Sequence, residues 1–397
     1  MGIIRGIIAL IFIAAVALLF SNGRKKIRYK NIIIMIVLQL AITFLFLQTT
    51  IGLTILSGAS NFFSWLINQG LAGVEFVFGG LVIEPGASVF FLNVLMPLVF
   101  ISALIGILSF LGILDFIVKW VGWGIDKITG MGELESYVPI ATTLLGSPQV
   151  FITIKDQIPK LNRKQLFTVC MTVISSASAA MLASYMTMLD GKFVVVAVFL
   201  NFFSGLVIAG IMEPYEEKAV VTDNSIDTDE LKEKDSFFQM LGDYIVSGFN
   251  LAIIVAAMVI GFISVISFLN NSLTAIVGVS FTQVFGYLFA PVAYLIGIPS
   301  EDVIQVGSIM ATKLLTNEFV AMGEVTRVVS ELSTKSIAMI SVYLVSFANF
   351  GTLGIITGAV KSIDEAKSAD IAKFSLKLIL GGTLAGMLTA AIVGFYF

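Results

Sequence analysis

Long apolar runs separated by short polar stretches recur along the whole chain. Several of them approach the roughly 20 residues that a helix needs to cross a bilayer, the first three beginning at Ile7, Asn31 and Val89. We therefore expect an all-α, polytopic membrane protein. Five basic residues between Ser21 and Lys30 follow the first run without a small-residue cleavage site, which predicts a retained anchor with its amino terminus outside.

The pattern predicts about eight membrane-spanning helices. These are 7–20, 31–53, 89–114, 165–189, 193–212, 250–269, 336–360 and 374–397. Residues 61–78 mix aromatic residues with amides and glycines, which favours a helix in the membrane interface over a span. Residues 272–298 are apolar but interrupted by glycine and proline, and we expect an interfacial or packed helix there.

Two further segments have polar ends and a polar centre. The first is 133–156, with Gly146 and Pro148 at its middle, and the second is 301–327. A straight helix is one interpretation of the first segment. Glycine and proline together favour a helix, a turn and a second helix that returns to the side it came from, so we expect two re-entrant hairpins.

The order span, hairpin, span, span occurs twice, and the two copies begin on opposite sides of the membrane. We expect N-terminal helices at 1–80, a first half at 88–212, a hydrophilic linker at 213–240 and a second half at 241–397. Such an inverted repeat is typical of alternating-access transporters, in which the solute binds where the broken elements meet.

Composition excludes several classes of function. Hydrophobic residues make up 58% of the chain and charged residues 12%, and the net charge is −3. The chain therefore suits lipid and offers no basic surface for nucleic acid. It has one cysteine, Cys170, and no histidine, which argues against a disulfide framework and the usual metal sites. An alternative from another class is an intramembrane hydrolase using Ser308 or Thr312 with Lys313.

Glu318 is the leading candidate for solute binding. A carboxylate inside the membrane costs a few kcal/mol or more, so its presence calls for a function. Thr316 and Asn317 precede it, and together the three side chains suit the hydroxyls of a sugar or polyol. The simpler alternative is that Glu318 pairs with Lys313 and holds the second hairpin together.

Asn349 is the second candidate. Gly351 and Gly354 weaken the helix around it, which predicts an unwound span whose backbone could bind a ligand or cation. A contact between helices through its amide is an equal alternative. Hydroxyls that could surround a sodium ion are those of Thr142, Ser175, Ser176 and Ser178. Small residues at a tight helix crossing explain these serines equally well.

Several motifs resemble the concentrative nucleoside transporters over essentially the whole chain. They are T-N-E-F-V-A-M at 316–322, S-F-A-N-F at 346–350, K-D-Q-I-P-K at 155–160, S-S-A-S at 175–178 and A-S-Y-M-T-M-L at 183–189. The resemblance implies a homotrimer in the bacterial inner membrane. Each protomer would have a scaffold, which includes 1–80, and an elevator-like transport domain. It implies symport of nucleosides with Na⁺ or H⁺ and no other cofactor.

The resemblance also implies roles for individual residues. Glu318, Asn349 and Thr352 would hold the ribose, with Asn317 in the same cluster and Phe347 near the nucleoside. The first hairpin departs from the family, because G-S-P-Q at 146–149 stands in place of G-Q-S-E or a close variant. Ser147 and Gln149 would then line the base side.

Two questions stay open at this point. Because the hairpin is unusual, the same fold could carry another ribosylated or base-like solute. A further interpretation is a sensor that binds nucleoside without moving it. The family's cation site would map to Thr142, Leu145, Ser175 and Ser176. Thr142 stands where sodium-coupled members can have asparagine, which leaves the choice between Na⁺ and H⁺ open.

Overall fold

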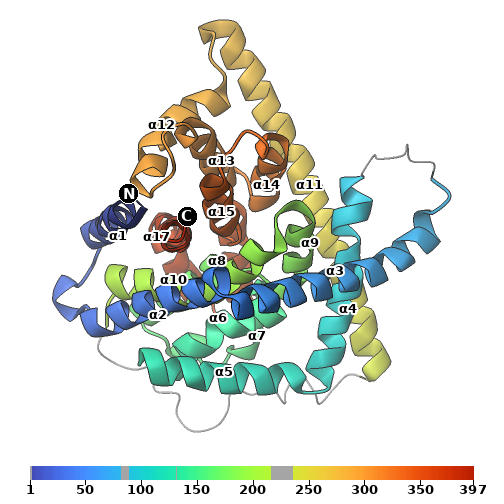
Figure 1. The fold of residues 1–397 in the computed structure, drawn as a ribbon. Coiled ribbons are helices and arrows are strands. Elements are labelled where there is room, and N and C mark those ends of the chain that lie inside the picture. Colours follow the sequence, from blue (N-terminus) through green and yellow to red (C-terminus); the bar gives the residue numbers. More distant parts are fainter. Residues whose placement is uncertain (1, 82–88, 131, 216–235) are drawn as a thin grey trace.

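The chain folds into helices (Figure 1). The structure, a computed structural model, describes residues 2–81, 89–130, 132–215 and 236–397, and these residues form helices and no β-strand. The helices are α1 (Gly2–Leu19), α2 (Tyr29–Gln48), α3 (Thr50–Phe78), α4 (Pro97–Phe110), α5 (Ile113–Thr129), α6 (Glu133–Leu145), α7 (Ser147–Thr153), α8 (Arg163–Ser175), α9 (Ala179–Met188), α10 (Gly191–Met212), α11 (Phe237–Val277), α12 (Phe281–Leu295), α13 (Val303–Leu315), α14 (Glu318–Val328), α15 (Thr334–Leu344), α16 (Phe350–Lys361) and α17 (Glu365–Gly394), with short helical turns at Arg24–Lys26, Phe91–Leu95 (η2) and Ile158–Lys160. The predicted all-α class is confirmed.

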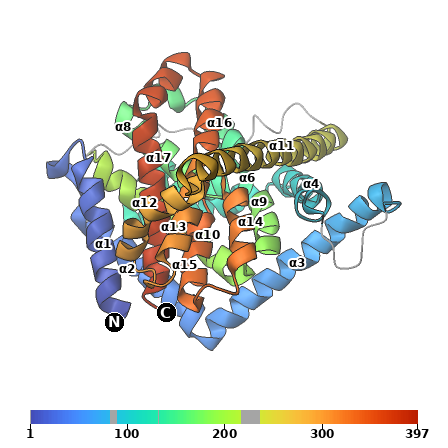
Figure 2. The same cartoon turned by 90° about the horizontal axis from the view of Figure 1, so that it is seen from above.

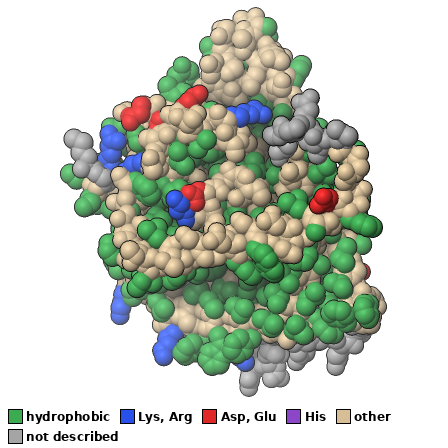
Figure 3. Space-filling view, turned by 45° about the vertical axis from the view of Figure 1, so that its right-hand side comes forward, with side chains coloured by type: hydrophobic (Ala, Val, Ile, Leu, Met, Phe, Trp, Pro, Cys, Tyr) green, Lys and Arg blue, Asp and Glu red, His purple; other side chains and the backbone are tan. Residues whose placement is uncertain are grey.

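The surface of the molecule suits lipid. Within the described residues, seven helical segments are long and apolar enough to cross a membrane. Hydrophobic side chains cover much of the face seen in Figure 3, and charged groups are few there. Phe76, Phe238 and Ile276 are 92%, 81% and 81% exposed. Lipid tails are as apolar as these side chains, so their exposure carries no hydrophobic cost in a bilayer.

The second predicted span ends earlier than expected. It was predicted to reach Leu53, but α2 stops at Gln48 and Thr49 adopts an extended conformation. Thr49 caps α3, because its hydroxyl accepts a hydrogen bond from the Gly52 N–H at 3.0 Å. Residues 61–78 are the second part of the 29-residue α3. The helix is therefore confirmed, and its placement in the membrane interface stays a prediction.

The second half of the chain begins with an unusually long helix. The span predicted at 250–269 is the middle of α11, which has 41 residues and begins at Phe237. Residues 237–240, assigned to the linker, thus form the first turn of this helix, and 216–235 lie outside the described residues. The helix ends at Gly278, whose φ of 78° is left-handed. α11 packs along α4 and lies across the direction of α1 and α17 (Figure 2).

Both predicted hairpins consist of two helices joined at a break. In the first, Gly146 separates α6 from α7 with a φ of 101°, a conformation that a side chain would oppose. In the second, Thr316 and Asn317 separate α13 from α14. The straight-helix alternative for the first segment is therefore wrong.

Two spans are unwound at their centres. Residues 165–189 were predicted as one span, and Arg163–Met188 is long and apolar enough to be one. Its helix is interrupted, however, because α8 ends at Ser175 and α9 starts at Ala179. The unwinding predicted near Asn349 is confirmed. It precedes Gly351, since α15 ends at Leu344 and Asn349 caps α16. The predicted order span, hairpin, span, span is present in both halves.

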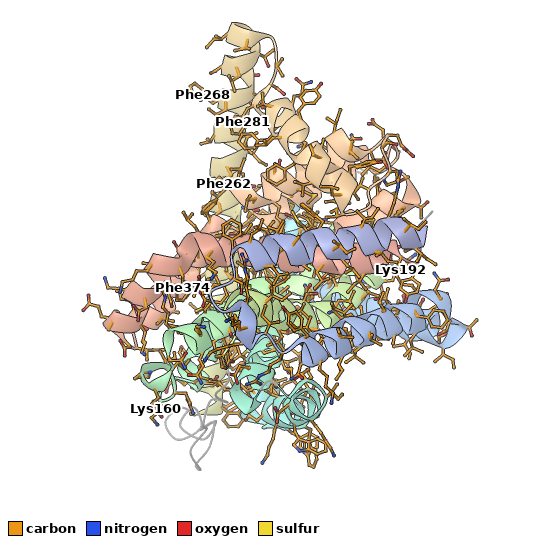
Figure 4. All side chains as sticks on the ribbon, turned by 90° about the vertical axis from the view of Figure 1, so that its left-hand side faces the viewer. Lys160, Lys192, Phe262, Phe268, Phe281 and Phe374 are labelled. Atoms are coloured by element: carbon orange, nitrogen blue, oxygen red, sulfur yellow. The ribbon has the colours of Figure 1, made fainter. Side chains whose placement is uncertain are left out.

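The broken spans lie in the centre of the molecule. α17 packs against α8, α10, α15 and α16, and most of its C-terminal half is buried. Figure 4 shows Lys160, just before α8, and Lys192, just after α9, at opposite sides of the molecule. The α8–α9 pair therefore crosses the whole structure, and its break falls deep inside it.

Candidate functional site

Glu318 is the first residue of α14 and is buried, with 4% of its surface exposed. Its Oε1 accepts a hydrogen bond from the Tyr185 hydroxyl at 2.8 Å, and its Oε2 accepts one from Asn349 Nδ2 at 2.9 Å. The N-terminus of a helix also favours a negative charge. The carboxylate is thus held by α9, by the second hairpin and by the start of α16.

Asn349 and Thr352 form one polar unit with Glu318. Asn349 Oδ1 accepts hydrogen bonds from the Thr352 N–H at 2.9 Å and from its hydroxyl at 3.3 Å. The amide of Asn349 therefore caps α16 with its oxygen and contacts Glu318 with its nitrogen. The geometry brings together three of the residues predicted to bind the ribose.

Asn317 and Thr316 have local partners. Asn317 caps α14, since its Oδ1 accepts the Val320 N–H at 3.0 Å. The Thr316 hydroxyl donates to the Thr312 carbonyl at 2.6 Å. These bonds explain why the second hairpin breaks here. The role of Asn317 in binding stays a prediction.

The hydrogen-bond partners of Lys313 are not those of the simpler alternative, in which it pairs directly with Glu318. Its buried ammonium donates to the Tyr343 carbonyl at 2.5 Å and to Ser346 Oγ at 2.6 Å, and it lies 4.3 Å from the centre of the Tyr343 ring. Lys313 therefore fixes the second hairpin to the end of α15, where carbonyls lack partners within the helix.

The enzyme alternative needs a hydroxyl beside Lys313. Ser308 Oγ instead donates to the Thr282 carbonyl at 3.3 Å, and Thr312 Oγ1 to Glu324 Oε1 at 3.1 Å. In the described part of the chain, neither hydroxyl is hydrogen-bonded to the lysine.

The first hairpin brings two uncommitted polar side chains to its tip. Ser147 Oγ is buried and has no hydrogen-bond partner among the described residues. Gln149 is half-buried, and a Cβ atom on Gly146 would lie 3.0 Å from its Oε1. α7, which carries both residues, packs against α16. The tip of the hairpin therefore lies near the helix that Asn349 caps, with polar groups available for a ligand.

The residues of the predicted cation site lie on packed elements. α6 packs against α8 and α9, and a Cβ on Gly146 would lie 3.8 Å from the Ser178 side chain. Leu145 and Ser175 end α6 and α8, and helix C-termini present carbonyl oxygens and partial negative charge. This donor type fits a sodium ion.

The hydroxyls of this set are not equally placed. Thr142 Oγ1 donates to the Val138 carbonyl at 2.7 Å, and Ser176 Oγ to the Thr172 carbonyl at 2.7 Å, so each oxygen keeps lone pairs for a cation. Ser175 Oγ also donates, to the Thr172 carbonyl at 3.2 Å, but it lies against Gly205 of α10, where a Cβ would approach it to 2.2 Å. Ser175 therefore serves the packing of α8 on α10.

Phe347 lies in the break between α15 and α16 and is buried. Its N–H donates to the Ser176 carbonyl at 3.2 Å, which joins the two unwound spans directly. The Asn201 amide of α10 donates to the carbonyl of Val345 in the same break. These contacts satisfy backbone groups that the unwinding leaves free.

Tyr185 is a site residue that the sequence motifs did not single out. It occurs in the A-S-Y-M-T-M-L motif, and its ring is fully buried. The one available signal was a tyrosine inside an apolar span, where a hydroxyl needs a partner. The partner, Glu318, is 133 residues away in sequence.

Two broken hairpins that meet two unwound spans beside a buried carboxylate define a multi-pass membrane transporter. The comparisons with known proteins agree. The sequence profile described as "Na+ dependent nucleoside transporter C-terminus" matches residues 193–394, and the corresponding N-terminus profile matches 6–81. The chain belongs to the concentrative nucleoside transporter family.

Relatives and solved structures cover the whole chain. It is 34% identical to the purine nucleoside transport protein NupG of Bacillus subtilis, over 100% of both chains. It is 26% identical to the nucleoside permease NupC of Helicobacter pylori, over 96% of this chain and 94% of the relative. Its fold matches CNTnw in an inward-facing substrate-bound state with a TM-score of 0.93, at 26% identity over 100% of this chain and 98% of that one. An outward-facing variant of CNTnw matches with a TM-score of 0.92.

Proposed function

We propose that this protein imports nucleosides together with a cation by alternating access across the bacterial inner membrane. The observation that carries the proposal is the Glu318 carboxylate, buried between Tyr185 and Asn349 where the second hairpin meets both broken spans. A carboxylate beside an amide accepts and donates hydrogen bonds, as vicinal ribose hydroxyls require. Glu318, Asn349 and Thr352 then bind the ribose, with Asn317 and Phe347 beside them.

The base lies on the side of the first hairpin in this proposal. Gln149 and Ser147 have polar groups without partners among the described residues, and a neutral amide and a hydroxyl can each donate and accept. A second candidate keeps the fold and the ribose site but carries another ribosylated or base-like solute. Its support is the G-S-P-Q sequence at this tip.

Cation coupling rests on the region between the ends of α6 and α8. Thr142, Leu145 and Ser176 would hold a sodium ion through hydroxyl and carbonyl oxygens, and Ser175 would contribute its backbone. Coupling to protons is the other form of the same proposal. In either form the chain acts as a transporter and not as an enzyme.

The proposal includes movement and assembly. The hairpins and broken spans would move as an elevator-like unit against a scaffold of α1 to α4 and α11. α11 carries exposed apolar side chains, including Phe268 at 69%, on a part that projects from the body (Figure 4). This surface would contact lipid and the other protomers of a homotrimer.

Uptake by purified protein in proteoliposomes tests the proposal. We expect accumulation of labelled nucleoside that follows an imposed sodium or proton gradient, and its loss in Glu318→Ala. Lys192→Ala, in the first turn of α10 with a half-exposed side chain, is the matched control and should transport normally. Competition by nucleosides, free bases and pentoses separates the two candidate solutes. Undiminished uptake by Glu318→Ala would remove the carboxylate from the site.

A further inference from the structure

A cavity lies next to the Glu318 site. Its volume is about 840 Å³, and it opens between η2, α11 and α14. Its wall includes two charged side chains of α14, Glu324 and Arg327, and two amides of α11, Asn270 and Asn271. Proteins bind drug-sized ligands in cavities of roughly 300–1,000 Å³. This cavity therefore has the size and the polar groups of a binding site for a small polar solute.

An aromatic wall separates this cavity from the carboxylate. Phe319 lines the cavity, directly follows Glu318 in sequence and is 3% exposed. Its ring meets Phe90 edge to face at 6.1 Å and lies 5.2 Å from the ring of Tyr185, whose hydroxyl holds Glu318. Phe90 precedes α4, whereas Phe319 belongs to the second hairpin. The pair of rings formed by Phe90 and Phe319 thus lies between the cavity and the Glu318 site.

The polar groups of the wall are fixed in place. Asn270 Oδ1 accepts the Thr282 N–H at 2.9 Å, and Glu324 Oε1 accepts the Thr312 hydroxyl at 3.1 Å. Asn270 uses only its oxygen in that bond, and Glu324 only one of its two oxygens, which leaves an amide N–H₂ and a carboxylate oxygen for a ligand. Gly323 has no atom within 4 Å of the position of a Cβ, so the space beside it is open.

We propose that this cavity is an outer binding site that takes the nucleoside before it reaches Glu318, and this rests on the proposed function. A nucleoside has a flat apolar base and hydroxyl-bearing sugar. Phe90 and Phe91 offer aromatic faces for the base, while Glu324 and the α11 amides offer partners for the hydroxyls. A lipid chain would match the aromatic rings but offer no hydrogen-bond partner to the second oxygen of Glu324 or to the amide of Asn270.

Cysteine protection tests the proposal directly. The native Cys170 is fully buried, so the wild-type chain should not react with a charged, membrane-impermeant methanethiosulfonate. Ser267→Cys places a thiol on the cavity wall, and Lys192→Cys places one at the half-exposed start of α10 as control. We expect adenosine or uridine to slow the labelling of Ser267→Cys and to leave that of Lys192→Cys unchanged.

The same labelling in a Glu318→Ala background separates the two sites. Protection of Ser267→Cys should persist there, because the outer site binds independently. Protection that disappears with Glu318 would overturn the proposal, as would an unprotected Ser267→Cys. No labelling at Ser267→Cys in a folded protein would mean a lipid-filled cavity, and would overturn it too. Protection without any uptake by the wild-type protein would instead contradict the proposed transport.

A substitution that fills the cavity gives a second test, through the KM for uptake. Gly323→Leu adds a side chain to open space, and Gly58→Leu in α3, which also has no neighbour within 4 Å, is the matched control. We expect Gly323→Leu to raise the KM for uptake about ten-fold while equilibrium binding at the Glu318 site changes little. Equal KM values for both variants would count against an outer site.

Discussion

The hydroxyl of Tyr185 donates a hydrogen bond to Glu318 Oε1 at 2.8 Å, and through it α9 contacts the second hairpin. Both groups are buried, and a hydrogen bond in such a weakly polar environment is stronger than one in water. The bond joins the first half of the chain to the second at the proposed ribose site. Removing the Tyr185 hydroxyl therefore alters the surroundings of the carboxylate while every residue of the hairpin stays the same.

Tyr185→Phe removes this bond and keeps the ring. A hydrogen bond to a charged group contributes about 1.5–3 kcal/mol, so we expect a lower melting temperature in detergent and weaker nucleoside binding. Tyr29→Phe, at an exposed tyrosine, is the matched control. Calorimetric binding and thermal unfolding measure both effects. Unchanged affinity in Tyr185→Phe would show that the hydroxyl does not support the carboxylate.

Lys313→Met should destabilise the protein by about 3 kcal/mol, because the Tyr343 carbonyl and Ser346 hydroxyl lose their buried donor. Glu318 would also lose the nearest positive charge of the hairpin. The double variant Lys313→Met/Glu318→Gln also removes the negative charge of the carboxylate and should recover part of the stability. Lys192→Met is the control, since its pair with Asp190 is exposed. Additive effects of the two single changes would exclude electrostatic coupling between the residues.

Gly146→Ala should disrupt the first hairpin. The φ of 101° is unfavourable for any L-residue with a side chain, and the added carbon would meet Gln149 Oε1 at 3.0 Å. We expect a loss of about 1–2 kcal/mol and reduced uptake. Gly124→Ala in α5 has open space and ordinary helical geometry, so it should stabilise by up to about 1 kcal/mol. Equal unfolding temperatures for the two variants would contradict this account of the turn.

Asp302 should make stability depend on pH in the acid range. It precedes α13 and accepts hydrogen bonds from the hydroxyls of Ser333 and Ser336, both at 2.6 Å. Burial alone would raise its pKa, but these bonds outweigh burial and hold the pKa below its ordinary value of 3.8. The ionised carboxylate therefore stabilises the fold fully above pH 3.8, and this contribution is lost as pH falls through the lowered pKa.

Unfolding curves of the wild type and Asp302→Asn measure this effect. The wild type should lose more stability than the variant as pH is lowered below about 4. Asp370, whose pKa is also lowered but which lies in an exposed pair with Lys373, gives the control Asp370→Asn. Parallel curves for the wild type and Asp302→Asn would show that Asp302 contributes nothing.

The sequence by itself determined that the chain folds in a lipid bilayer. It also determined where the two hairpins break. Runs of apolar residues long enough to cross a bilayer allow only helices here, because each backbone group must find a partner within its own segment. Gly146 and Pro148 predicted the first turn, and Glu318 stood out because a carboxylate in lipid is costly.

Only the tertiary structure decided which groups meet at the site. No local signal placed a break at Ser176, since the unwound backbone is stabilised by the Phe347 N–H from the other half of the chain. The partners of Glu318 and Lys313 likewise come from distant elements. Helix periods and turn residues act over a few positions, whereas a buried polar group is satisfied by whatever the packed fold brings within hydrogen-bond distance.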